Sequence, residues 1–214
     1  MPDQATRIIA VRHGETAWNV DARIQGQLDI ALNPTGLLQA ARVAQALADE
    51  SIDAIYASDL LRAWQTARAI AEVADCPLKP SLGLRERGFG RFEGRTYAEI
   101  ESLWPEESMH WRKRDPHWAP IGGESLTTMR KRVLDTVTQL AQQHLGQQIV
   151  LVAHGGVMDL LYRLATGQEL QAPRTWMLGN AAINRLLWTP DGFTLVGWSD
   201  TSHLEDLIRD ETST

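Results

Sequence analysis

The hydrophobic positions of the chain follow two alternating patterns, short β-branched runs and longer stretches with helical spacing. Residues 7–11 and 52–57 are short apolar runs that predict buried strands. Residues 149–153 form an apolar run without a polar interruption, which is typical of a central strand covered on both faces. Near the end of the chain, a Thr-Pro-Asp-Gly turn separates residues 183–188 from residues 193–198 and predicts a strand hairpin.

Between these strands, apolar residues recur every three or four positions, as expected of amphipathic helices. The first helix should begin after Asn33, and the second after Ser58, which we expect to act as its N-cap. A third helix is predicted over residues 125–144, and a fourth runs from Val157 until Gly167 ends it in the left-handed conformation. The predicted inward faces of the first three helices are Leu37, Ala40, Ala41, Ala44, Leu47 and Ala48; Leu60, Ala63, Trp64, Ala67 and Ala71; and Leu126, Met129, Val133, Val137, Leu140 and Ala141.

This alternation of strands and helices predicts an α/β fold, a three-layer α/β/α sandwich around a mainly parallel central sheet. Residues 83–123 interrupt the alternation with several glycines, prolines and mixed charges. We interpret this segment as an excursion over the edge of the sheet that serves as a lid or rim. The chain has no internal repeat or linker-like stretch, so residues 1–214 are expected to form a single domain.

Composition narrows the classes of partner. A chain of 214 residues with 43% hydrophobic and 22% charged side chains can bury a substantial core without metals or disulfides. Its formal net charge of −6 argues against nucleic acid as a partner, but not against a small anion in a local pocket. The single cysteine, Cys76, is expected to be a buried apolar residue. The N-terminal segment lacks the features of a signal peptide and no apolar run could cross a bilayer, so we expect a cytoplasmic protein that does not bind membranes.

Candidate chemistry appears where two predicted strands end in a histidine followed by a glycine, at His13-Gly14 and His154-Gly155. Ligands of open α/β sheets bind beyond the carboxyl ends of the strands, so parallel neighbouring strands would bring both histidines to one crevice. The two glycines are expected to let backbone amides approach a ligand. Arg12 adds a permanent planar cation, which suits phosphate or carboxylate oxygens.

Two further residues complete a candidate reaction site. Arg62 is predicted in the first turn of a helix at the same end of the sheet, where a helix N-terminus also favours anions. A neutral histidine can attack phosphorus, and fixed arginines stabilise the charge of the transferring group. A carboxyl group must then protonate the leaving oxygen and activate water. Glu86 is the best candidate because Arg85 and Arg87 flank it, with Glu93, Glu99 and Glu124 as alternatives.

Four sequence blocks carry a resemblance to a known family. They are RHGETAWN at residues 12–19, SDLLRAWQTA at residues 58–67, LRERGFGRFEG at residues 84–94 and VAHGG at residues 152–156. In this order they resemble the histidine phosphatase superfamily, whose members have the phosphoglycerate mutase-like fold. A lone RHG would be a weak signal, whereas four blocks in the family's order are a specific one.

The resemblance implies a role for each matching residue. It implies His13 as the phosphorylated nucleophile, and Arg12, Arg62 and His154 as the phosphate pocket. Glu86 is implied as the group that donates and then accepts the proton. The family needs no metal, and we expect no cofactor. Further substrate contacts implied by the resemblance are Asn19 and, in the block IQGQLD, Gln25 and Gly26.

Within the superfamily, the sequence favours the phosphatase branch. Cofactor-dependent mutases usually have a tyrosine where this chain has Phe89, followed by a longer stretch that holds a bisphosphate. We therefore expect a histidine acid-type phosphatase, a phosphoric monoester hydrolase that acts on small phosphorylated metabolites. Proteins of this branch are often named mutases all the same. The main alternative is a cofactor-dependent phosphoglycerate mutase, or a related phosphotransferase, that uses the same phosphohistidine intermediate but keeps water out.

Two other classes remain as alternatives. His13, His154 and Glu86 have the ligand types of a two-histidine, one-carboxylate metalloenzyme. Against that interpretation, Arg12 and Arg62 would crowd a cation, and the sequence has no short-spaced ligand pair. A phosphate-binding module without catalysis is the second alternative, disfavoured because every residue type needed for catalysis is present.

The excursion also contains Trp104, Trp111 and Trp118, with Arg112 and Arg114 among them. These residues form either an aromatic and basic rim of the substrate pocket or a set of packing tryptophans with solvated charges, and we favour packing. Exposed tryptophans of the excursion or of the C-terminal hairpin could also form a homodimer contact. The histidines expected to be surface or packing residues are His110, His117, His144 and His203.

Overall fold

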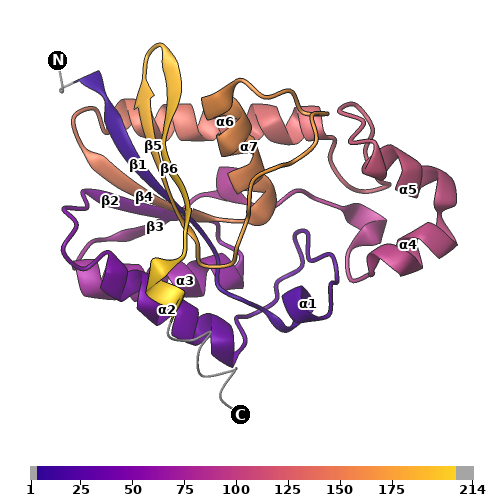
Figure 1. Ribbon diagram of the computed structural model, residues 1–214, viewed down its shortest axis with the longest axis horizontal. Helices are drawn as coiled ribbons and strands as arrows, with labels where there is room; N and C mark the ends of the chain where they lie inside the picture. The colour runs from indigo at the N-terminus through magenta and orange to yellow at the C-terminus, as the bar shows by residue number, and fades with distance from the viewer. Residues whose placement is uncertain (1–3, 206–214) are drawn as a thin grey trace.

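A six-stranded mixed sheet organises the computed structural model, which describes residues 4–205. The strand order is β3-β2-β4-β1-β5-β6 (Figure 1). Parallel pairs join β3, β2, β4 and β1, whereas β5 and β6 add an antiparallel edge. The α/β class, the central position of the uninterrupted apolar strand and the C-terminal hairpin are confirmed. The strands are β1 (Thr6–Arg12), β2 (Ala54–Ala57), β3 (Leu78–Pro80), β4 (Gln148–Ala153), β5 (Ile183–Thr189) and β6 (Gly192–Asp200).

Helices cover both faces of this sheet. Helices α6 and α7 pack on one face and α2 and α3 on the other, so the predicted three-layer sandwich is confirmed (Figure 1). The α-helices are α1 (Ala17–Val20), α2 (Pro34–Ala46), α3 (Leu61–Ala74), α4 (Tyr97–Leu103), α5 (Pro105–Arg112), α6 (Leu126–Gln143) and α7 (Gly155–Thr166). Short 3₁₀ helices are η2 (Leu82–Leu84), η3 (Gly90–Phe92) and η4 (Ser202–Leu204).

The two cores follow from the alternation of side chains along each strand. In β1, Ile8 and Ala10 pack in the core with α6 and α7, whereas Ile9 and Val11 pack in the core with α2 and α3. Both faces of β1 and β4 are therefore buried, which explains their continuous apolar sequence. Cys76 is buried in the core with α2 and α3, as its sequence context indicated.

Helices α6 and α7 match the sequence pattern closely. Ser125 caps α6 by accepting a hydrogen bond from the Thr128 amide, and the six residues predicted to face inward are the buried residues of that helix. Gly167 ends α7 with a φ of 68°, the left-handed conformation that glycine adopts without strain.

The predicted inward face of α2 is partly wrong. Leu37 is 51% exposed, whereas Val43, outside the predicted face, is fully buried. Both faces satisfy helical spacing, so the sequence pattern alone could not choose between them. The buried face begins at Gly36, where a Cβ would lie 2.0 Å from the Glu15 carbonyl oxygen, and it continues through Ala40, Val43 and Ala44.

Ser58 is not the N-cap of α3. The helix begins at Leu61 with Leu60 in the capping position, and no side chain caps its first turn. The Ser58 hydroxyl instead accepts a hydrogen bond from the Leu60 amide and lies 2.8 Å from His154 Nε2. Ser58 still pairs with β4, because its amide donates to the Val152 carbonyl oxygen (3.0 Å), and its side chain is fully buried.

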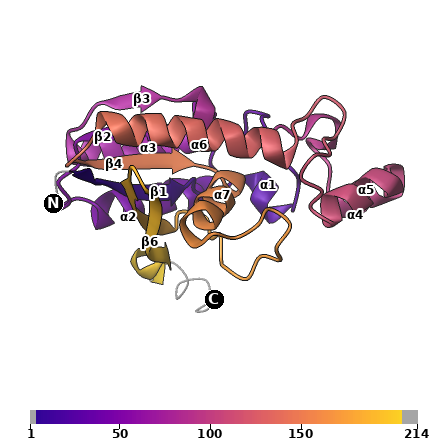
Figure 2. The ribbon, with the colours of Figure 1, turned by 90° about the horizontal axis from the view of Figure 1, so that it is seen from above.

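The excursion over residues 83–123 extends beyond one end of the sheet and carries α4 and α5 (Figures 1 and 2). Its packing is organised around the buried ring of Phe92. The ring centroids of Trp104, Trp111 and Trp118 lie 5.6, 5.7 and 5.8 Å from that of Phe92. All three tryptophans therefore pack around Phe92, as the favoured interpretation predicted, and Trp111 also lines a cavity described below.

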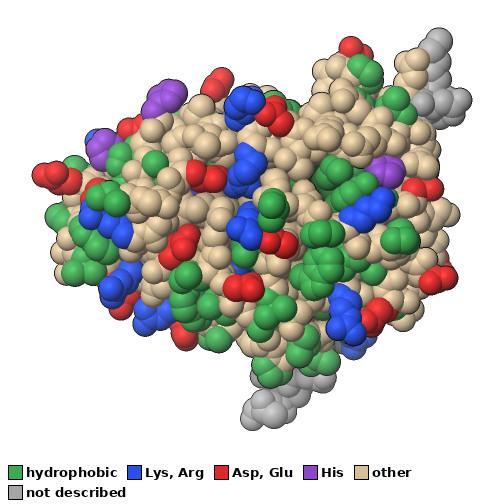
Figure 3. Space-filling view, turned by 180° about the vertical axis from the view of Figure 1, so that it is seen from behind, with side chains coloured by type: hydrophobic (Ala, Val, Ile, Leu, Met, Phe, Trp, Pro, Cys, Tyr) green, Lys and Arg blue, Asp and Glu red, His purple; other side chains and the backbone are tan. Residues whose placement is uncertain are grey.

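Positive and negative side chains are interspersed on the face shown in Figure 3, without a large patch of one sign. The part of the chain drawn in colour on this face therefore has no extended basic track for a polyanion. Within residues 4–205, every helix is too short or too polar to span a bilayer.

Candidate active site

The two histidine-glycine pairs meet because β1 and β4 are parallel neighbours. Their register pairs Arg12 with Ala153, so His13 and His154 leave the sheet side by side. The ring centroids of the two histidines are 5.2 Å apart, and both side chains are buried. The predicted shared crevice is therefore present.

His13 is held as a neutral imidazole with one defined tautomer. Its Nδ1 lies 2.7 Å from the Gly14 carbonyl oxygen, which can only accept, so Nδ1 carries the proton and Nε2 carries the lone pair. Burial lowers the pKa of His13 well below its usual value, and the nearby cations Arg12 and Arg62 lower it further. A neutral imidazole with a free Nε2 is the form that can attack an electrophile.

His154 occupies the N-cap position of α7 and is also kept neutral. Burial is the main cause that lowers its pKa, followed by the charges of the neighbouring arginines, Arg62 before Arg12. Ser58 can donate its hydroxyl proton to Nε2, which places the ring proton on Nδ1. Nδ1 is buried and has no partner among residues 4–205, so a ligand oxygen could accept its hydrogen bond.

Two arginines supply positive charge to the crevice, Arg62 from a buried position and Arg12 from a half-buried one. Arg62 is 1% exposed and donates to the carbonyl oxygens of Leu28 (2.8 Å) and Gly26 (2.7 Å), while Arg12 donates to that of Leu178. Burial lowers the pKa of both, that of Arg62 to about 10, so both stay protonated at neutral pH. Each Nε is buried without a partner in the described part of the chain. An anion would satisfy donors that the protein leaves unpaired.

Arg62 does not pair with Asp59, which forms an ion pair with Arg85 instead. The hydrogen bonds that Arg62 donates to the loop of residues 24–29 bring that loop, including Gln25 and Gly26, to the site.

Glu86 is the carboxylate that reaches the crevice. Its Oε2 accepts a hydrogen bond from the Gly156 amide (3.0 Å), and its Oε1 accepts one from the Arg87 amide (2.8 Å). A Cβ on residue 156 would lie 2.2 Å from Oε1, so only glycine permits this approach. The alternatives have other contacts: Glu93 accepts the backbone N–H groups of Gln27 and Phe89, Glu99 caps α4, and Glu124 pairs with Arg132.

Two adjoining cavities unite the predicted site residues. The smaller, of about 180 Å³, is lined by Arg12, His13, Asn19, Gln25, Gly26, Arg62 and Glu86 together with Arg23, Ile24 and Phe89. The larger, of about 550 Å³, shares Arg12 and Glu86 with it and includes Gly155. His154 lies against His13 and completes the set.

Two expectations need correction or refinement. The Gly14 amide donates to Thr66 Oγ1 (3.0 Å), so it is not available to a ligand; glycine is needed there because a Cβ would lie 2.5 Å from the Gly36 carbonyl oxygen. The Asn19 side-chain oxygen accepts from the Thr16 amide in the capping box of α1, which leaves only its amide N–H groups for a ligand.

The segment before β5 contributes residues that the sequence analysis missed. Asn180 Nδ2 donates to the carbonyl oxygens of His13 (3.0 Å) and Gly14 (3.3 Å), and the Ala181 amide donates to those of Arg12 (3.1 Å) and His13 (3.2 Å). Ala181 adopts a φ of 57°, which L residues rarely do. These contacts clamp the strand end that carries His13. A lone asparagine far along the chain gave no signal of this role.

The rim interpretation of the excursion holds for part of it. Trp111 and Arg114 line the larger cavity, whereas Arg112 pairs with Glu101 on the outer surface and does not line it. The remaining histidines have surface or packing environments, as expected: His110 pairs with Asp115, His144 with Tyr56, and His203 with the Ala181 carbonyl oxygen, while His117 is exposed.

The metalloenzyme alternative finds no support in the geometry. Among residues 4–205, no three histidine, cysteine, aspartate or glutamate side chains are grouped as metal ligands would be.

Comparisons with known proteins agree with this geometry. Residues 8–201 match the family model of the histidine phosphatase superfamily (branch 1). A metal-independent phosphoserine phosphatase from Arabidopsis thaliana is 37% identical over 207 residues, covering 95% of this chain and 85% of that protein. A probable phosphoglycerate mutase, GpmB, from Yersinia pestis (strain Pestoides F) is 35% identical over 214 residues, covering 96% and 98%. The solved structure of a phosphoserine phosphatase mutant from Entamoeba histolytica in complex with phosphoserine has a TM-score of 0.84 and 30% identity, covering 93% and 99%.

Burial of the two neutral histidines predicts a loss of stability in acid. Their folded pKa values lie well below the value of about 6.5 for an unfolded chain. As the pH falls below about 6.5, the unfolded state takes up protons that the folded state does not, so the free energy of unfolding should fall, by up to about 1.4 kcal/mol per pH unit for each histidine. The free energy of unfolding can be measured by urea denaturation at several pH values between about pH 7 and pH 5. It should fall less steeply with decreasing pH for His154→Gln than for the unaltered chain. His117→Gln, at an exposed position, is the control, and equal slopes for all three proteins would contradict the prediction.

Proposed function

This chain belongs to the histidine phosphatase superfamily, and we propose that it hydrolyses small phosphorylated metabolites through a phosphohistidine formed at His13. One observation supports the proposal above all. The buried, neutral imidazole of His13 has its lone pair on Nε2 and lines a small cavity together with two arginines that have unpaired donors. The relatives named as phosphatases support a hydrolase of this kind.

In the first step, His13 Nε2 attacks the phosphorus atom as the ester P–O bond breaks. Arg12, Arg62 and His154 donate hydrogen bonds to the phosphoryl oxygens, whose charge must be stabilised in the transition state. Glu86, entering this step protonated, gives its proton to the leaving alkoxide, and the alcohol departs.

In the second step, water attacks the phosphorus atom of phosphohistidine. Glu86, now a carboxylate, removes a proton from this water, and the P–N bond breaks to restore neutral His13 and release inorganic phosphate. Because Glu86 lines both cavities, it can serve the leaving oxygen and the incoming water from one position.

Removal of the nucleophile tests the mechanism. His13→Ala should lower kcat for p-nitrophenyl phosphate by at least about a thousandfold while leaving the circular dichroism spectrum unchanged, because no other group can form the intermediate. The matched control, His117→Ala, should keep full activity. Vanadate should inhibit the unaltered enzyme and EDTA should not. Retained turnover in His13→Ala, or loss of activity in EDTA, would refute the mechanism.

The role of Glu86 can be tested by the choice of leaving group. Glu86→Gln cannot donate the proton, so kcat for an alkyl phosphate should fall by about 10²-fold or more. p-Nitrophenolate leaves readily without protonation, so the rate of phosphoenzyme formation from p-nitrophenyl phosphate should fall much less. This rate can be measured as the burst phase of the reaction. An equal fall in the burst rate for both esters would show that Glu86 is not the acid.

A phosphoglycerate mutase is the second candidate function, because one of the similar proteins carries that name. The open cavity of about 550 Å³ next to Glu86 favours hydrolysis, since water can reach the intermediate. We expect 3-phosphoglycerate to yield inorganic phosphate and no 2-phosphoglycerate, with or without 2,3-bisphosphoglycerate. Isomerisation that depends on the bisphosphate would instead establish the mutase.

The expected cytoplasmic location and homodimer stay predictions.

A further inference from the structure

The larger cavity adjoins the smaller one around His13 on the side of Glu86. The two cavities share Glu86, the proposed proton donor to the leaving oxygen, so the larger cavity is where the proposed function would place the part of the substrate that leaves. Its other walls come from the excursion, through Phe89, Trp111 and Arg114, and from the segment between α7 and β5. Groups on these walls can therefore distinguish one phosphate ester from another.

The charges that line this cavity are unbalanced. Four arginines face two carboxylates, Glu86 and Asp159. Asp159 Oδ2 is already shared by Arg114 (2.7 Å) and by Arg163 (3.0 Å), which lies behind the cavity wall. The cavity thus keeps a positive excess beyond its internal ion pairs.

Three of the four arginines have other hydrogen-bond partners. Arg12 donates to Leu178, Arg114 bonds to Asp159, and Arg87 donates to the carbonyl oxygens of Glu124 (2.9 Å) and Trp118 (3.3 Å). Arg174 differs from them. Within the described chain it makes no hydrogen bond or ion pair, and its guanidinium is exposed at the mouth of the cavity.

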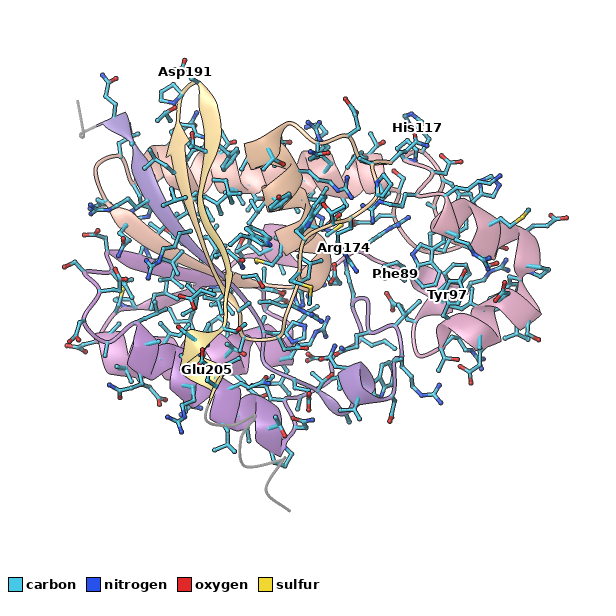
Figure 4. All side chains as sticks on the ribbon, in the orientation of Figure 1. Phe89, Tyr97, His117, Arg174, Asp191 and Glu205 are labelled. Carbon is cyan, nitrogen blue, oxygen red and sulfur yellow. The ribbon has the colours of Figure 1, made fainter. Side chains whose placement is uncertain are left out.

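The segment that carries Arg174 is anchored just after this residue. Two residues later, the Trp176 ring stacks on Tyr162 with centroids 4.1 Å apart, and Leu178 accepts the hydrogen bond from Arg12. Figure 4 labels Arg174 and Phe89, which line the cavity together from different segments. Burial is the main cause that lowers the pKa of Arg12 and that of Arg114, and the charge of Arg174 adds a smaller lowering to each. Mutual repulsion of these cations is relieved when an anion binds between them.

We propose that Arg174 binds a carboxylate on the leaving group, so that the preferred substrates are phosphate esters of small hydroxy acids or amino acids. In the proposed function, Arg12 and Arg62 bind the phosphoryl group. Arg174 therefore remains available for a second anionic group. A planar guanidinium suits a carboxylate because it can donate two parallel hydrogen bonds. The inference rests on the proposed function, since it concerns what that function acts on.

Matched pairs of esters test this inference. 3-Phosphoglycerate and glycerol 3-phosphate differ only in that a carboxylate replaces a hydroxymethyl group, and O-phosphoserine and O-phosphoethanolamine differ only in a carboxylate. The unaltered protein should prefer the acid in each pair by about tenfold or more in kcat/KM. Arg174→Ala should remove most of this preference by lowering kcat/KM for the acids. The kcat/KM for the esters that lack the carboxylate, and for p-nitrophenyl phosphate, should change by less than about twofold.

Arg42→Ala is the matched control, because Arg42 is exposed on α2 and does not line the cavity. It should leave kcat/KM unchanged for all five substrates. Hydrolysis without a preference for the acids, or a preference that survives Arg174→Ala, would overturn the inference while the proposed function stands. Failure to hydrolyse any ester, p-nitrophenyl phosphate included, would overturn the proposed function and this inference with it.

Discussion

The parallel pairing of β1 with β4 is the constraint on which the candidate site depends. Because their ends are in register, two histidines 141 positions apart in sequence lie with ring centroids 5.2 Å apart. Their burial beneath a sandwich of helices keeps both rings neutral, and the Gly14 carbonyl oxygen fixes the tautomer of His13. The sheet thus sets both the position and the protonation state of the proposed nucleophile.

Positive charge at this site is concentrated by burial. Arg12 and Arg62 are held by backbone carbonyl oxygens, which orient them without neutralising them. A carboxylate partner would have cancelled their charge and competed with phosphate. The formal net charge of −6 is an average over the whole chain, and the face in Figure 3 carries both signs, whereas the site has its own local excess of cations in Arg12 and Arg62.

Segments distant in sequence support the reactive groups. Asn180 and Ala181 clamp the strand end that carries His13, while Gly156, in the first turn of α7, positions the carboxylate of Glu86. Such contacts use backbone atoms and ordinary residue types. They are as specific as the catalytic residues in space but leave little trace in composition or spacing.

The sequence by itself determined the α/β class, the order of five of the six strands and of the four helices that cover the sheet, the buried face of α6 and the residues that converge at the strand ends. These features follow from local periodicity and from the rule that parallel strands present their carboxyl ends together. Tertiary structure alone decided which face of α2 is buried, that Ser58 turns toward His154 instead of capping a helix, and that Arg174 faces the cavity of the leaving group. Each of these outcomes depends on a contact between residues far apart in the chain, and spacing along one segment carries no information about the surface it meets.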